Sequence, residues 1–282
     1  MKERIQKLLA NAGVDSRRNI EQMVLQGRIT VNGKTVNDLP VMVDPQADKI
    51  TVDGEVVRLR GRRGGDATGE RIYVLMNKPK GVYTTNVSQG VQRRAIDLLP
   101  DDFPRVYPVG RLDAESKGLL LLTNDGELTH KLTHPRFGVL KTYRATVDGF
   151  VSPQIIEELE KGVWLADPKT GKGVKTARSQ VKILHRENEQ TILEMTLKEG
   201  GNSQIRRILA HRGHKVRELI RIKMGPLALE KLAAGEFRPL SPKEVRALKE
   251  YASGRESRKP GHEEGKAKQP PTREDRREKE SE

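Results

Sequence analysis

The chain has 282 residues, with 53 Lys and Arg against 39 Asp and Glu, 34% hydrophobic residues and no cysteine. This length accommodates one or two globular domains, and the lack of cysteine excludes disulfides, thiolate metal sites and cysteine nucleophiles. The net charge of +14 favours a polyanionic partner, because lysines and arginines that neutralise phosphates release condensed counterions.

Neither a membrane segment nor a secretion signal is visible in the sequence. No run of 18 apolar residues occurs, and residues 1–4 carry charges where a signal peptide requires an apolar core. We therefore expect a cytoplasmic protein without membrane contact.

The first 60 residues predict two helices followed by a small sheet. Apolar residues from Ile5 to Leu9 share one helix face, and Ser16 can cap a second helix. Asn32-Gly33 and Asp53-Gly54 predict tight hairpins, because these residue types tolerate positive φ.

The same segment resembles a known RNA-binding domain. Residues 4–14, the Ser16-Arg17-Arg18 corner and residues 27–33 are similar to the alpha-L domain named after small-subunit ribosomal protein four. The resemblance implies RNA contact through Arg17 and Arg18. From charge alone, these arginines could equally be solvated residues at the corner of a helical hairpin.

Composition divides the rest of the chain. Residues 61–71 are rich in glycine, which predicts a flexible linker between an N-terminal domain (1–60) and a larger one (72–252). Residues 253–282 hold 17 charged residues and few apolar ones, so we expect a disordered tail. The tail is nearly neutral, and the charge excess lies in the larger domain, which carries +10.

The larger domain mixes strand and helix patterns. Predicted strands are residues 71–76, 119–122, 142–147, 180–184 and 190–198. Predicted helices are residues 127–134, a helix starting at Ser152-Pro153, and residues 203–211. Because these elements show no regular βαβ repeat, they predict an α+β fold.

Familiar cofactor motifs are absent from the sequence. It contains no phosphate-binding G-x-x-x-x-G-K-[ST] loop, no G-x-G-x-x-G following a strand, and no H-E-x-x-H or G-x-S-x-G motif. His211 and His214 lie close together without a third ligand nearby. We therefore expect no metal, nucleotide or other cofactor.

Three segments carry residues suited to chemistry or to RNA binding. Gly110-Arg111-Leu112-Asp113 places a charged pair before an apolar strand that could orient the carboxylate. Tyr143 begins another strand, where its ring could form a pocket wall. Residues 198–223 hold 8 basic and 2 acidic residues, which is over half of the domain's charge excess.

Together these segments resemble the RsuA-type family of RNA pseudouridine synthases, from residue 1 to about residue 248. The matching motifs are Lys78-Pro79-x-Gly81, Gly110-Arg111-Leu112-Asp113 with Gly118-Leu119-Leu120, Lys141-x-Tyr143 and Gln204-Ile205-Arg206-Arg207. The resemblance implies a mixed, mostly antiparallel sheet with a central RNA cleft. It also implies isomerisation of uridine to pseudouridine without a cofactor, after the base has been flipped out of the RNA.

The resemblance further implies residue roles. Asp113 is the catalytic carboxylate, as nucleophile or base; Arg206 pairs with it, and Tyr143 stacks on the uracil and can take the proton from its fifth carbon. Residues implied to shape the cleft are Lys78, Pro79, Gly81, Gly110 and Leu112. Residues expected to contact RNA are Arg17, Arg18, Arg111, Arg207, Arg212, Lys215, Arg217, Arg221 and Lys223.

Alternative interpretations remain open on the sequence. One is a non-catalytic, ribosome-associated RNA-binding factor; another is a glycoside hydrolase in which Glu115 serves as acid beside Asp113. The expected partner is ribosomal RNA or a ribosomal subunit precursor, bound by a monomer. Large-subunit (23S) rRNA is favoured, because the segments after Gly149 and past Arg221 resemble large-subunit enzymes slightly better; small-subunit (16S) rRNA is the second choice.

Overall fold

The computed structural model describes residues 2–57, 70–86, 90–166, 170–198 and 202–254. Most of the predicted linker (61–71) and nearly all of the predicted tail (253–282) therefore lie outside the described residues. The domain boundaries placed at these two segments stay predictions.

The N-terminal unit folds as two helices and small sheets around its own core. Its elements are β1 (Glu3–Arg4), α1 (Ile5–Asn11), α2 (Arg17–Leu25), β2 (Ile29–Val31), β3 (Lys34–Val36), β4 (Met42–Val43), β5 (Ile50–Val52) and β6 (Glu55–Val56). The backbone N–H of Asn19 donates to the Ser16 hydroxyl at 3.2 Å, which confirms the predicted cap of α2. Asn32 and Gly33 both have positive φ, as the predicted hairpin requires.

The larger unit is built on one sheet with strand order β13-β14-β10-β15-β9-β7-β17. Its elements are β7 (Tyr73–Lys78), η1 (Ala95–Leu98), β8 (Tyr107–Pro108), β9 (Lys117–Thr123), α3 (Gly126–Thr133), η2 (Pro135–Phe137), β10 (Lys141–Asp148), α4 (Pro153–Lys161), β11 (Trp164–Ala166), β12 (Gly173–Lys175), β13 (Ser179–Arg186), β14 (Gln190–Leu197), α5 (Asn202–His211), β15 (Val216–Met224), β16 (Leu227–Ala228), β17 (Phe237–Pro239) and α6 (Pro242–Ala252). Among the described strands of this sheet, only β15 and β9 pair in parallel. The fold is thus α+β with a mixed, mostly antiparallel sheet, as predicted.

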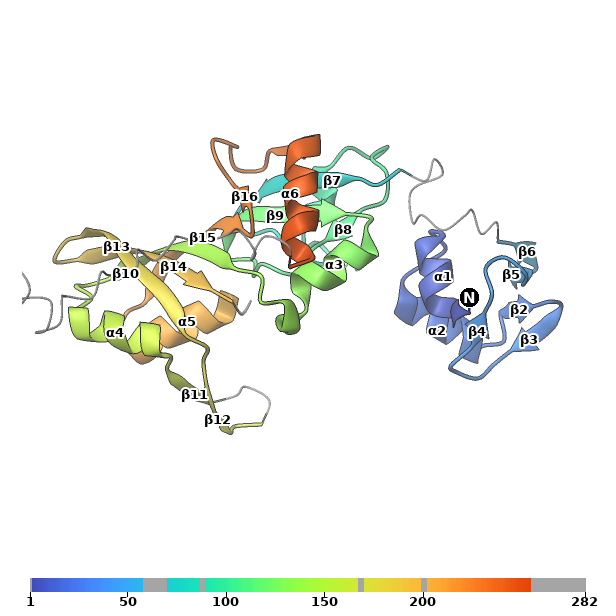
Figure 1. The fold of residues 1–282 in the computed structure, drawn as a ribbon, viewed down its shortest axis with the longest axis horizontal. Coiled ribbons are helices and arrows are strands. Elements are labelled where there is room, and N and C mark those ends of the chain that lie inside the picture. The colour runs from blue at the N-terminus through green and yellow to red at the C-terminus, as the bar shows by residue number, and fades with distance from the viewer. Residues whose placement is uncertain (1, 58–69, 87–89, 167–169, 199–201, 255–282) are drawn as a thin grey trace, which may run out of the picture.

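Two apolar cores lie on opposite faces of this sheet. Successive side chains of a strand point to opposite faces, so Leu120 and Leu122 of β9 join one core while Leu119 and Leu121 join the other. Helices α4 and α5 cover the first core, and α3 and α6 cover the second (Figure 1). The uninterrupted run of leucines in β9 is therefore the signature of a strand buried on both faces.

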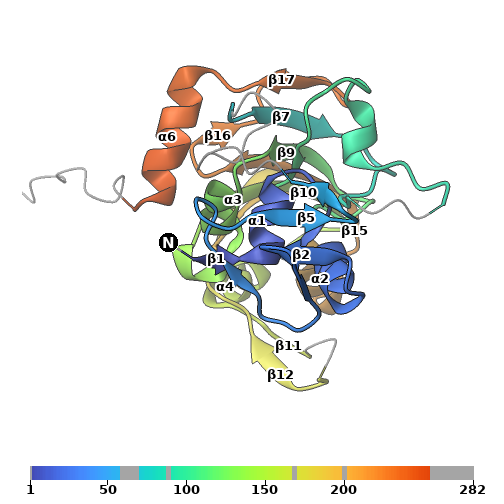
Figure 2. The same ribbon diagram turned by 90° about the vertical axis from the view of Figure 1, so that its right-hand side faces the viewer.

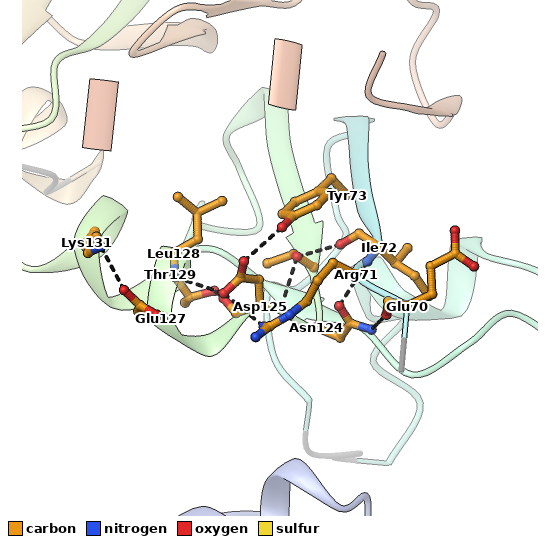
Figure 3. A network of polar contacts seen from close by, with 11 residues as sticks. Glu70, Arg71, Ile72, Tyr73, Asn124, Asp125, Glu127, Leu128, Thr129 and Lys131 are labelled. Carbon is orange, nitrogen blue, oxygen red and sulfur yellow. Dashed lines mark hydrogen bonds and ion pairs between the residues drawn. The ribbon is translucent and has the colours of Figure 1, made fainter. Parts of the chain in front are cut away.

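A polar network holds the point where the chain enters the larger unit (Figure 3). Asp125, at the N-cap of α3, accepts from the Tyr73 hydroxyl at 2.8 Å and from the Leu128 backbone at 3.1 Å, and pairs with Arg71 at 3.0 Å. Burial, and then the Asp125 carboxylate, raises the pKa of Tyr73. The Asn124-Asp125 turn thus ties the entering segment to α3.

Glycine is required where β9 pairs with β15. Gly118 has φ +104, and a Cβ built there would lie 2.3 Å from the Arg221 carbonyl oxygen. No side chain fits at this distance, so the motif glycine allows the two strands to approach.

Several elements were not predicted from the sequence. They are strand β15, the β11–β12 hairpin, β17 and α6, of which β15 occupies the centre of the sheet. Within the part of the chain that the structure describes, every helix is too short and too polar to cross a lipid bilayer.

Candidate active site

The backbone around Asp113 is held by hydrogen bonds from a loop that follows β7. The Thr84 hydroxyl donates to the Leu112 carbonyl at 2.8 Å and accepts from the Leu112 N–H at 3.2 Å. The Gly81 N–H donates to the Ala114 carbonyl at 2.8 Å. These bonds fix the residues on either side of half-buried Asp113, whose carboxylate accepts no hydrogen bond from the described residues.

Lys78, at the end of β7, is a fully buried cation beneath this loop. Its ammonium donates to the carbonyls of Val82 at 2.7 Å, Pro79 at 2.9 Å and Ala114 at 3.4 Å. Burial lowers the pKa of Lys78 to about 8, while the nearby Asp113 carboxylate opposes this shift. The residue predicted to shape a cleft wall thus ties the Lys-Pro-x-Gly turn to the Asp113 loop.

Arg206, in α5, also contacts the Asp113 loop. Its guanidinium donates to the Glu115 carbonyl at 3.1 Å and to the Val216 carbonyl at 3.0 Å. The two described residues Arg206 and Asp113 form no ion pair, so the implied direct pairing is not seen. Arg206 instead connects the segment following Asp113 to the start of β15.

Arg221 of β15 corrects the predicted RNA contacts. The sequence suggested phosphate binding, yet Arg221 is only 2% exposed and its Nε donates to the Leu119 carbonyl at 2.7 Å. Burial lowers the pKa values of Lys78 and Lys141, and the Arg221 charge adds to both shifts. An arginine buried between strands does not bind an RNA backbone at the surface; it supplies positive charge beneath the site.

Tyr143 of β10 lies opposite Arg221 in the sheet register. Its side chain is 1% exposed within the first apolar core, to which Leu112 also belongs. The buried hydroxyl has no hydrogen-bond partner in the structure. Because buried hydroxyls are normally paired, this one is suited to act on a ligand rather than to stabilise the fold.

Three of the remaining predicted RNA contacts already have partners within the fold. Arg212 pairs with Glu158 at 2.8 Å, Arg217 pairs with Asp148, and Arg207 donates to the Ala166 carbonyl. Other predicted contacts have exposed side chains: Arg17, Arg18, Arg111, Lys215 and Lys223. Within residues 198–223, Arg207, Arg212 and Arg217 would therefore have to give up these partners before they could bind a phosphate.

The two groups that suggested other chemistry have structural partners. Glu115 is exposed and pairs with Lys80 at 3.0 Å, so it lacks the buried setting of a glycosidase acid. His214 Nδ1 lies 2.8 Å from the Asp148 carbonyl oxygen. Across the described ranges, no three His, Asp or Glu side chains are grouped so that they could hold a metal ion.

Sequence reasoning missed three supports of this site. Thr84 carries no signal, because its partner Leu112 is distant in sequence and an isolated threonine is uninformative. The buried states of Lys78 and Arg221 are equally hidden, since both residue types are normally solvated.

Comparisons with known proteins agree with this geometry. Residues 72–211 match the family model described as RNA pseudouridylate synthase, and residues 3–48 match the S4 domain model. The chain is 37% identical to ribosomal large subunit pseudouridine synthase B of Bacillus subtilis, covering 89% of this chain and 97% of the relative. It is 39% identical to an uncharacterized RNA pseudouridine synthase of Aquifex aeolicus, covering 88% and 94% of the two chains. A crystal structure of a pseudouridylate synthase superposes with a TM-score of 0.61 at 27% identity, covering 87% of this chain and 99% of the other.

Proposed function

Because this chain belongs to the RNA pseudouridine synthase family, we propose that it isomerises a uridine of large-subunit ribosomal RNA with Asp113 as the catalytic carboxylate. The observation that carries the residue assignment is the Asp113 loop: its backbone is fixed on both sides, while no described donor occupies the carboxylate. The 37% identity to a large-subunit enzyme supports the choice of substrate.

The reaction needs no atoms beyond those of the nucleotide. The bond between the ribose C1′ and the uracil N1 breaks, the base turns, and a bond forms between C1′ and C5. C5 then loses its proton and N1 ends protonated. Asp113 can assist the first step either as a nucleophile at C1′ or as a base that helps uracil to depart.

Positively charged side chains help to hold the Asp113 loop in one position. Lys78 and Arg221 interact electrostatically with one another, and the Asp113 charge acts on Lys78. Since Lys78 and Arg206 are anchored to backbone carbonyls, they hold the loop in one position before RNA binds.

Tyr143 is proposed to contact the flipped uracil and to accept the C5 proton through its hydroxyl. Tyr143→Phe should then lower the rate of pseudouridine formation by about 10²-fold or more, as expected for loss of a general base. The same change should raise the free energy of unfolding by about 1 kcal/mol, because it removes a buried hydroxyl without a partner. Urea unfolding and a single-turnover isomerisation assay measure both effects.

Tyr251→Phe is the matched control. The Tyr251 hydroxyl accepts from the Leu140 N–H at 3.2 Å, so its loss should lower stability by up to about 1 kcal/mol and leave the reaction unchanged. If Tyr143→Phe retained full activity, the Tyr143 hydroxyl could not be the group that accepts the C5 proton.

The proposed substrate is tested by mapping pseudouridines in ribosomal RNA from cells with and without the gene. We expect one or a few sites to be lost from 23S rRNA, and the purified protein should restore them in transcripts. Loss confined to 16S rRNA would move the substrate to the small subunit. An unchanged map, together with no reaction on either RNA, would leave the chain as a binding factor.

A further inference from the structure

The only tryptophan of the chain lies on a hairpin that projects from the larger unit. Trp164 is 64% exposed and belongs to β11, which pairs with β12 through Trp164↔Lys175 and Ala166↔Gly173. Both views show this hairpin extending beyond α4 (Figures 1 and 2). Single exposed apolar side chains are common on protein surfaces, so the inference depends on what surrounds the indole rather than on its exposure alone.

The base of the hairpin is firmly attached to the fold. The Val163 N–H donates to the Thr176 hydroxyl and the Thr176 N–H donates to the Val163 carbonyl, each at 2.9 Å. Leu165 is buried in the first core, on the opposite side of β11 from Trp164. Arg207 of α5 donates to the Ala166 carbonyl. The hairpin is thus coupled to the helix that carries Arg206.

The described residues of the hairpin around Trp164 carry basic charges only. Trp164 has small neighbours, since a Cβ built on Gly173 would lie 3.7 Å from the indole Cε3. Within residues 162–166 and 170–178, the charged side chains are those of Lys172, Lys175 and Arg178, and all three are exposed. These described stretches contain no Asp or Glu. An indole flanked by cations is the arrangement with which proteins stack a nucleobase and hold its phosphates.

We propose that Trp164 stacks on an unpaired nucleotide of the RNA substrate, next to the region in which the target uridine is flipped, with Lys172 and Lys175 against the adjoining phosphates. This inference rests on the proposed function, because it assigns a second contact to the same RNA. A second copy of the chain is a poor occupant, since two such faces would bring like charges together.

The single tryptophan makes the test direct. Binding of a short single-stranded RNA oligonucleotide to the full-length protein should quench the intrinsic tryptophan fluorescence saturably. Inorganic polyphosphate, which carries charge but no base, should bind the lysines without quenching. Equal quenching by both ligands, or by neither, would overturn the stacking proposal.

Matched variants make the test quantitative. Trp164→Ala should raise the Kd for the oligonucleotide about tenfold, whereas Trp164→Phe should remain within about threefold of the unsubstituted protein. Val174→Ala, on the same hairpin and also exposed, should leave the Kd unchanged. An unchanged Kd in Trp164→Ala would contradict the proposal. Concentration-dependent dimerisation that Trp164→Ala abolishes would instead assign the ring to self-association and overturn it.

Failure of this inference is separable from failure of the proposed function. If the protein forms pseudouridine but RNA does not quench Trp164, the hairpin proposal fails and the enzyme assignment stands. If RNA quenches Trp164 but no uridine is isomerised, the contact stands and the proposed reaction fails.

Discussion

Asp113→Asn should abolish pseudouridine formation, by about 10³-fold or more, while leaving folding and RNA binding intact. Asparagine has nearly the same shape, but its amide is neither a competent nucleophile nor a base. The loop should keep its position, because its hydrogen bonds from Thr84, Gly81 and Lys78 all go to backbone groups. Single-turnover isomerisation and RNA binding by fluorescence anisotropy separate catalysis from affinity.

Glu115→Gln is the control for this experiment. It neutralises a carboxylate two residues away that is exposed and paired with Lys80. Activity should stay within about twofold, because exposed ion pairs contribute little. Substantial turnover by Asp113→Asn, or inactivity of Glu115→Gln alone, would refute the proposed assignment of the carboxylates.

Gly118→Ala should destabilise the larger unit by roughly 3 kcal/mol or more. The new methyl group would lie 2.3 Å from the Arg221 carbonyl oxygen and 2.8 Å from the Arg221 nitrogen, and neither backbone atom can move without separating β9 from β15. The positive φ of Gly118 adds about 1–2 kcal/mol of strain. Because β9 follows the Asp113 loop and β15 carries Arg221, activity should fall as well. Chemical denaturation gives the free energy of unfolding.

Gly235→Ala isolates the steric part of this effect. Gly235 also has positive φ, but a Cβ built there meets no atom within 4 Å. It should therefore cost only about 1–2 kcal/mol of conformational strain. Equal losses in the two variants would show that backbone conformation, and not the close approach of β9 to β15, determines the cost.

Much of the fold was predictable because the local signals were strong. The cap at Ser16, the hairpin at Asn32-Gly33 and the alternation within residues 142–147 each depend on neighbours in the sequence. Strand β15 was missed because Arg221 interrupts its apolar face with a charge, and a cluster of basic residues indicates RNA contact more readily than a central strand. Its partners Tyr143 and Gly118 come from distant segments.

The site could be predicted only in part, because motifs are local while the contacts that hold the site join distant segments. Motifs identified Asp113, Tyr143 and Arg206 as residues to examine, but no local pattern shows how the loop is held. Lys78 illustrates the difference. From the sequence, Lys-Pro-x-Gly looks like a solvated turn. In the fold, the Lys78 ammonium is buried and donates a hydrogen bond to the Ala114 carbonyl, which comes from a distant segment. Desolvation of its charge is a property of the assembled fold.

The parallel pairing of β9 with β15 also determines when the site can exist during synthesis. The bond from Arg221 Nε to the Leu119 carbonyl joins residues 102 positions apart, and Arg206 joins Glu115 to Val216. Contacts between such distant segments form late, because a long loop must close before they are made. We therefore expect a growing chain to complete its N-terminal unit well before the Asp113 loop is held in place, and a chain that ends before β15 should lack the contacts that fix this loop.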